Sequence, residues 1–123
     1  MKIIFIGGNA HSGTTIFEQF LSREMNVLAL GEIYYSFQVF IRKEIQNYTC
    51  SCNDQANCIW TSIINNWSKS NVKTYFEAYR ILIESVHDLY PEVEVISDSS
   101  KYPQAFQEII TLQPELILVS KNP

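Results

Sequence analysis

Residues 3–17 read Ile-Ile-Phe-Ile-Gly-Gly-Asn-Ala-His-Ser-Gly-Thr-Thr-Ile-Phe, an apolar run followed by a glycine-rich turn. The apolar run is typical of a buried strand, and the residues after the turn favour a helix. A strand that leads through such a turn into a helix leaves several backbone N–H groups directed at one spot, at the positive end of the helix dipole. The sequence therefore predicts an anion-binding loop that suits a phosphate group.

The spacing of Gly8 and Gly13 matches the ATP-binding P-loop, in which a lysine follows the second glycine. Thr14 occupies that position in this chain. Because the missing lysine contacts the phosphates of Mg-ATP, its replacement disfavours a kinase. A kinase-like phosphotransferase is kept as an alternative, which dependence on Mg-ATP would distinguish.

Composition limits the class of protein. The chain has 123 residues, of which 46% are hydrophobic and 13% aromatic, so we expect one folded domain over residues 1–123 rather than a disordered chain. A net charge of −4 argues against a nucleic-acid partner. The initial apolar run is too short for a signal peptide or a membrane span, and three cysteines are too few and too clustered for a disulfide framework. We expect a cytoplasmic protein.

Apolar periodicity predicts alternating strands and helices along the chain. Strands are expected over residues 2–6, 27–30, 93–96 and 116–119, helices over 14–25, 33–46, 58–68, 72–90 and 103–112, and a polar loop over 47–57. This alternation predicts an α/β fold, a parallel sheet with flanking helices. The last strand is continuously apolar, as in a strand buried on both faces, and ends close to Pro123. We therefore expect the fold to be incomplete at the C-terminus.

Four separated segments carry a resemblance to a known family. They read His-Ser-Gly-Thr-Thr (11–15), Leu-Ala-Leu-Gly-Glu (28–32), Ser-Asp-Ser-Ser-Lys-Tyr-Pro (97–103) and Leu-Val-Ser-Lys-Asn-Pro (118–123), with Cys50-Ser51-Cys52 and Cys58-Ile59-Trp60 between the second and the third. Their order and spacing resemble the sulfotransferases that use 3′-phosphoadenosine 5′-phosphosulfate (PAPS). The resemblance implies a P-loop NTPase-like sulfotransferase fold and transfer of a sulfuryl group from PAPS to a hydroxyl or amine acceptor, with no metal required.

The resemblance also implies roles for individual residues. The 5′-phosphosulfate of PAPS would be bound by a set of loop residues and by two residues of the third segment, namely His11, Ser12, Gly13, Thr14, Thr15, Ser100 and Lys101, and the 3′-phosphate by Lys121. The catalytic residues would be His11, Glu32 and Lys101. Glu32 corresponds to a general base in some relatives, or else it caps the helix that starts near Ile33. Asp98 orients the third segment or caps the following helix.

Two features depart from the family pattern. His11 stands where relatives place arginine or sometimes lysine, and a histidine titrates near neutrality. The serine that helps relatives hold the 3′-phosphate would lie beyond the fourth segment, outside residues 1–123. A truncated, inactive remnant that still binds the nucleotide is therefore a second alternative. The three cysteines fit a loop over the acceptor cleft better than a zinc site, because a fourth ligand is missing nearby.

Overall fold

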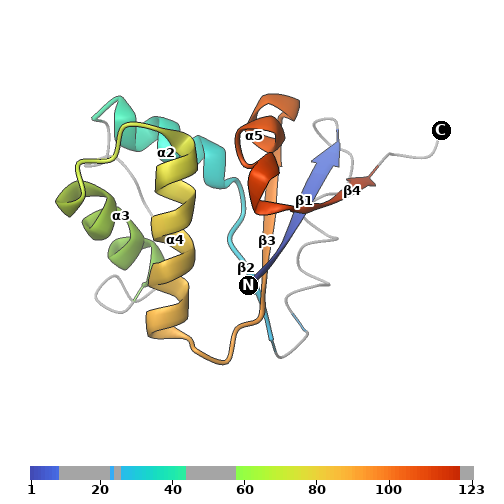
Figure 1. Cartoon of the computed structure of the whole chain (residues 1–123), viewed down its shortest axis with the longest axis horizontal. Coiled ribbons are helices and arrows are strands. Elements are labelled where there is room, and N and C mark those ends of the chain that lie inside the picture. Colours follow the sequence, from blue (N-terminus) through green and yellow to red (C-terminus); the bar gives the residue numbers. More distant parts are fainter. Residues whose placement is uncertain (9–22, 24–25, 44–57, 120–123) are drawn as a thin grey trace. The chain divides into compact units, whose positions relative to one another are not determined.

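The computed structural model describes residues 1–8, 23, 26–43 and 58–119 (Figure 1). It divides into two compact units, one made of Met1–Tyr35 with Glu92–Pro123 and the other of Ser36–Pro91. Nearly all of the predicted helix over 14–25 and the whole predicted loop over 47–57 lie outside the described residues. That residues 1–123 form a single domain stays a prediction.

The first unit is built on a four-stranded sheet. Its strands are β1 (Lys2–Gly8), β2 (Val27–Ala29), β3 (Val95–Lys101) and β4 (Glu115–Val119), in the order β2-β3-β1-β4. Every neighbouring pair is parallel. The predicted α/β class with a parallel sheet and flanking helices is therefore confirmed.

The central position of β1 follows from its composition. β1 pairs with β3 on one side and with β4 on the other, and the side chains of Ile3, Phe5 and Ile6 are almost fully buried. A strand covered on both faces needs such a continuous apolar run. Helix α5 (Pro103–Glu108) packs against this strand, since the rings of Phe5 and Phe106 lie 5.4 Å apart between their centroids.

The third strand is longer than its sequence indicates. It was predicted over residues 93–96, with a polar turn after it, but β3 begins at Val95 and continues to Lys101. The backbone of its polar half is paired with both neighbours: Asp98 lies opposite Phe5 of β1, and the Ser97 carbonyl accepts a hydrogen bond from the Leu30 N–H. Main-chain pairing with two neighbours thus extends the strand through residues of low strand propensity.

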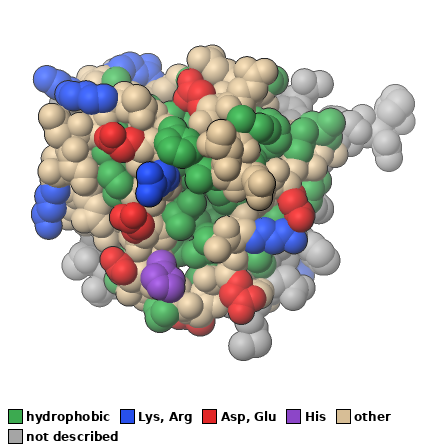
Figure 2. Space-filling view, viewed as in Figure 1, with side chains coloured by type: hydrophobic (Ala, Val, Ile, Leu, Met, Phe, Trp, Pro, Cys, Tyr) green, Lys and Arg blue, Asp and Glu red, His purple; other side chains and the backbone are tan. Residues whose placement is uncertain are grey.

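The fourth strand lies at an edge of the described sheet, and the prediction that it is buried on both faces is wrong. β4 pairs with β1 alone, and Leu116 and Leu118 are 48% and 73% exposed. Figure 2 shows hydrophobic side chains at the surface in the region of β4 and α5. The continuous apolar run of β4 is therefore not accompanied by burial of these two leucine side chains.

The helices agree with the predicted ones except at their ends. They are α2 (Ile33–Ile41), α3 (Ile59–Lys69) and α4 (Tyr75–Leu89), and α5 is followed by a 3₁₀ turn, η2 (Ile110–Leu112). Helix α4 starts three residues later than predicted because the Thr74 hydroxyl accepts a hydrogen bond from the Glu77 N–H, 3.2 Å away, as an N-cap does. The single helix predicted over 103–112 is divided at Ile109.

The second unit has an aromatic core around Trp67 of α3. Its indole is fully buried and contacts the rings of Phe37, Phe40 and Trp60, and its Nε1 donates a 2.8 Å hydrogen bond to the Ala78 carbonyl. Phe37, Trp60 and Trp67 are buried and form this core, whereas Tyr35 of α2 is 53% exposed. Among the described helices, none has the length and apolar character needed to cross a membrane.

Candidate functional site

The strand order marks one edge of the sheet as the place for a ligand. The connection after β1 leads past β3 to β2, whereas the connection after β3 leads past β1 to β4. Two neighbouring strands are thus followed by connections that leave in opposite directions. In open parallel sheets, ligands bind outside the carboxyl ends of the strands at such a point. The carboxyl ends of β1 and β3 carry Gly7-Gly8 and Ser100-Lys101.

An extra residue in β3 changes the direction of the chain at this edge. Phe5 pairs with Asp98 and Gly7 with Lys101, so two steps along β1 correspond to three along β3. An insertion of this kind redirects the side chains that follow it. Lys101 has a φ of 73°, in the left-handed region that costs a residue with a side chain about 1–3 kcal/mol. The rest of the fold therefore holds Lys101 in an unfavourable backbone conformation beside the end of β1.

A buried polar cluster precedes Lys101. Ser97, Asp98, Ser99 and Ser100 are all buried. Asp98 Oδ1 accepts hydrogen bonds from the Ser100 N–H (2.9 Å) and the Ser100 hydroxyl (2.5 Å). The N-cap residue of α5 is Tyr102, which makes no side-chain capping bond. Of the two roles considered for Asp98, the geometry supports the orientation of its own segment.

The segment that contains Glu32 lies against this cluster. The Ser99 N–H donates to the Gly31 carbonyl (2.9 Å), and the Tyr34 N–H, in the first turn of α2, donates to the Ser100 hydroxyl oxygen (3.0 Å). Gly31 has a φ of 71°, a conformation that glycine adopts without steric cost. Two hydrogen bonds therefore join the chain on either side of Glu32 to consecutive residues of β3.

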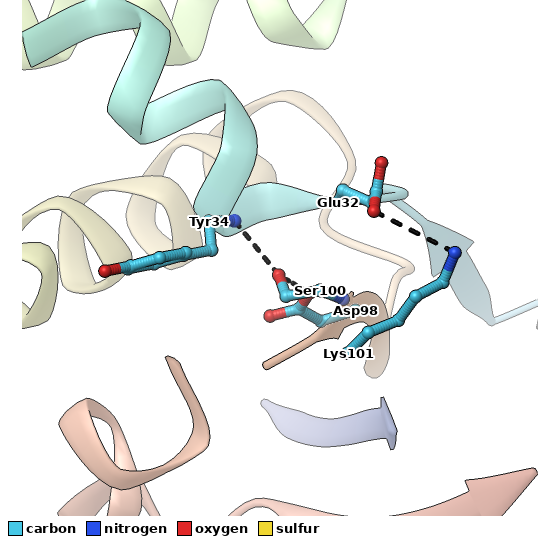
Figure 3. Close-up of polar contacts among 5 residues, drawn as sticks. All are labelled: Glu32, Tyr34, Asp98, Ser100 and Lys101. Carbon is cyan, nitrogen blue, oxygen red and sulfur yellow. Dashed lines mark hydrogen bonds and ion pairs between the residues drawn. The ribbon is translucent and has the colours of Figure 1, made fainter. Parts of the chain in front are cut away.

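These connections bring Glu32 and Lys101 together. Lys101 Nζ lies 3.9 Å from Glu32 Oε1, and the two side chains are 24% and 46% exposed (Figure 3). An ion pair this long and open to solvent stabilises a fold by about 0–1 kcal/mol at most. Its importance is positional, because an accessible carboxylate and an accessible ammonium group meet at the edge where a ligand is expected.

Most of the predicted donor-binding loop lies outside the described residues. The loop residues concerned are His11, Ser12, Gly13, Thr14 and Thr15. Lys121, Cys50 and Cys52 lie outside the described residues as well. Of the residues predicted to bind the donor, the structure describes Ser100 and Lys101, which are adjacent at the end of β3. Within the described ranges, His, Cys, Asp and Glu side chains form no group suited to a metal ion.

Sequence reasoning missed a hollow beside this site. It has a volume of about 350 Å³ and is lined by Phe5, Gly7, Lys101, Pro103, Phe106, Gln107, Leu116 and Leu118. A side chain on Gly7 would begin only 3.1 Å from Leu118 Cδ2, so glycine keeps the hollow open. Leu116 and Leu118 lie two apart in β4 and so share a face, but the continuously apolar sequence of residues 116–119 does not indicate which face lines a hollow.

Comparison with known proteins gives no relative from which a role could be transferred. No family model, curated protein or solved structure matches the chain. Any functional conclusion therefore rests on the residues and geometry given above.

Proposed function

We propose that this chain is a PAPS-dependent sulfotransferase domain of P-loop-like fold, which transfers a sulfuryl group to a hydroxyl or amine acceptor. The observation that carries the proposal is the pairing of Glu32 with Lys101, 3.9 Å apart, beside the carboxyl end of β1. Both residues belong to segments of the sequence that resemble this family. The sheet order supports the proposal by placing this pair where ligands of parallel sheets bind.

Lys101 is proposed to act on the leaving group. When the acceptor oxygen or nitrogen attacks the donor's sulfur, the bond between sulfur and the oxygen of the 5′-phosphate breaks, and negative charge develops on that oxygen. A positioned ammonium group stabilises this charge where it forms. The side chain is partly exposed and projects at the end of β3, so the leaving oxygen can approach it.

Glu32 is proposed to accept the proton that the acceptor loses as the new bond to sulfur forms. A general base has to lie within hydrogen-bond reach of that proton. The carboxylate is nearly half exposed and next to Lys101, so an acceptor that reaches it also lies near the proposed leaving group. The alternative role, a negative charge at the N-terminus of α2, also fits the position of Glu32, since α2 begins at Ile33 directly after it.

The donor site is completed in this proposal by the loop after β1. Gly7 and Gly8 end the strand directly before it, and Lys101 pairs in register with Gly7. Backbone N–H groups of such a loop, with the hydroxyls of Ser12, Thr14 and Thr15, suit the oxygens of a 5′-phosphosulfate. His11 would supply the cation that relatives take from arginine. The observed neighbourhood of Gly7 and Lys101 supports one ligand contacting both segments.

Thermal unfolding with two nucleotides tests the proposal. The full chain is melted with 3′-phosphoadenosine 5′-phosphate, the product of the donor, and separately with Mg-ATP. A ligand that binds only the folded state at about 100 times its Kd adds about 2.7 kcal/mol of stability. We expect the bisphosphate to raise the melting temperature. A rise with Mg-ATP alone would instead support the kinase-like alternative, and binding of the bisphosphate without transfer to any acceptor would support the inactive remnant.

A further inference from the structure

We infer that Ser100, held by Asp98, is a positioning residue that fixes Glu32 beside Lys101, and that it does not donate a hydrogen bond to the donor's phosphosulfate. The inference rests on the proposed function for the roles of Glu32 and Lys101. It assigns to Ser100 a role different from the ligand contact that the family resemblance implies.

The hydroxyl group of Ser100 is already used in two hydrogen bonds within the protein. A hydroxyl group has one proton and two lone pairs. The proton is directed to Asp98 Oδ1, 2.5 Å away, and a lone pair accepts the Tyr34 N–H at 3.0 Å. A carboxylate is a stronger acceptor than a neutral oxygen, and the short distance is typical of a charge-assisted bond. Ser100 therefore has no proton left with which to bind an anion.

Ser100 is also buried, so a ligand cannot reach its hydroxyl group. Ser100 and Asp98 have no exposed surface, whereas the side chains of Glu32 and Lys101 are open to solvent. Figure 3 shows Ser100 between Tyr34 and Asp98, with the Lys101 side chain extending away toward Glu32. A ligand that approaches Lys101 meets the ammonium group, while the hydroxyl of Ser100 is enclosed by the polypeptide.

Ser100 and its hydrogen-bond partner Tyr34 lie close in sequence to Lys101 and Glu32. Lys101 follows Ser100 directly, and Glu32 precedes Tyr34 by two residues. The hydrogen bond from the Tyr34 N–H to the Ser100 hydroxyl thus joins the two segments next to Glu32 and Lys101. The bond from the Ser99 N–H to the Gly31 carbonyl joins them again on the other side of Glu32. Asp98 adds rigidity, because it holds both the backbone and the side chain of Ser100.

Hydrogen exchange of the Tyr34 amide, measured by NMR on the ligand-free full chain, tests this connection. Ser100→Ala removes the acceptor, and we expect the amide to exchange about five- to tenfold faster, the effect of losing one ordinary hydrogen bond. Asp98→Asn keeps an Oδ1 acceptor for the Ser100 hydroxyl and is expected to stay within about twofold of the wild-type rate. Ser85→Ala is the matched control, since Ser85 is a buried serine in the other unit.

A transfer assay then separates positioning from binding. Loss of alignment should lower kcat of Ser100→Ala about tenfold, with the KM for the donor within about threefold. An unchanged Tyr34 exchange rate together with a tenfold higher donor KM would make Ser100 a ligand and overturn the inference. If Tyr34 exchange accelerates while the wild-type chain binds no bisphosphate, the structural connection holds and the proposed function is the part that fails.

Discussion

Gly7 and Lys101 lie opposite each other in the register of β1 and β3, each at the carboxyl end of its strand. One residue lacks a side chain, and a Cβ atom there would lie 3.1 Å from Leu118 Cδ2. The other carries a partly exposed ammonium group. The proposed nucleotide site requires such a cation at the carboxyl edge of the sheet, beside the loop to which the proposal assigns the backbone N–H donors.

The backbone conformation of Lys101 favours glycine, whereas the proposed function requires the lysine side chain. At a φ of 73°, glycine is favoured over any residue with a Cβ atom. We expect Lys101→Gly to be more stable than Lys101→Ala by about 1 kcal/mol, although neither variant keeps the charge. Urea unfolding of both variants measures the difference. Equal stabilities, or a more stable alanine variant, would contradict the left-handed conformation at this position.

Replacing Gly31 by alanine should lower the free energy of unfolding through backbone strain alone. Its φ is 71°, and an added Cβ atom would meet nothing within 4 Å. Gly31→Ala should therefore lower the free energy of unfolding by about 1–2 kcal/mol without any steric clash. Gly7→Ala is the complementary case, because its Cβ atom would crowd the exposed side chain of Leu118, which is free to turn away. A cost for Gly31→Ala below that for Gly7→Ala would contradict this explanation.

Part of this fold could be predicted from the sequence because buried strands and helices carry apolar residues at a regular spacing. The apolar residues of β1 and the spacing in α3 and α4 identified those elements to within three residues at each end. The rule that parallel strands end at the same edge of a sheet places the carboxyl end of β3 beside the glycine-rich end of β1. Such rules depend only on local periodicity and strand direction.

The remaining features depend on pairing between distant segments. No local signal in Ser97–Lys101 indicates a strand, since its polar residues are held by β1 and by the chain before Glu32. The exposure of Leu118 depends on which strand lies beside β4. Likewise, the 3.9 Å distance between Glu32 and Lys101 results from hydrogen bonds between residues more than 60 positions apart in the sequence.

Trp67 should dominate the stability of the second unit. It is fully buried, and its Nε1 donates to the Ala78 carbonyl at 2.8 Å. Trp67→Phe removes volume from the core and leaves that carbonyl without this donor, so we expect a loss of about 2–4 kcal/mol. Chemical unfolding followed by far-ultraviolet circular dichroism measures it. A loss below about 1 kcal/mol would contradict the assigned role, since it would match an ordinary surface substitution.

The exposed leucines of β4 predict self-association. An apolar strand at a sheet edge offers a surface on which other chains can pair. Leu118→Lys should reduce light scattering of concentrated solutions while changing the free energy of unfolding by no more than about 0.5 kcal/mol. Leu89→Lys, at an exposed position of α4, makes the same chemical change elsewhere and should leave scattering unchanged. Equal effects of the two variants would mean that net charge, and not β4, controls association.

The affinity of two lysine variants for 3′-phosphoadenosine 5′-phosphate tests the proposed donor site most directly. Lys101 stands at the carboxyl end of β3, whereas Lys2 stands at the opposite end of β1, paired with Glu115 at 3.1 Å on the surface. Titration calorimetry should show that Lys101→Ala weakens binding about tenfold or more, as expected for loss of a charged hydrogen-bonding partner. Lys2→Ala should bind with the wild-type Kd. Equal affinities of the two variants would contradict the assignment of this edge of the sheet as the nucleotide site.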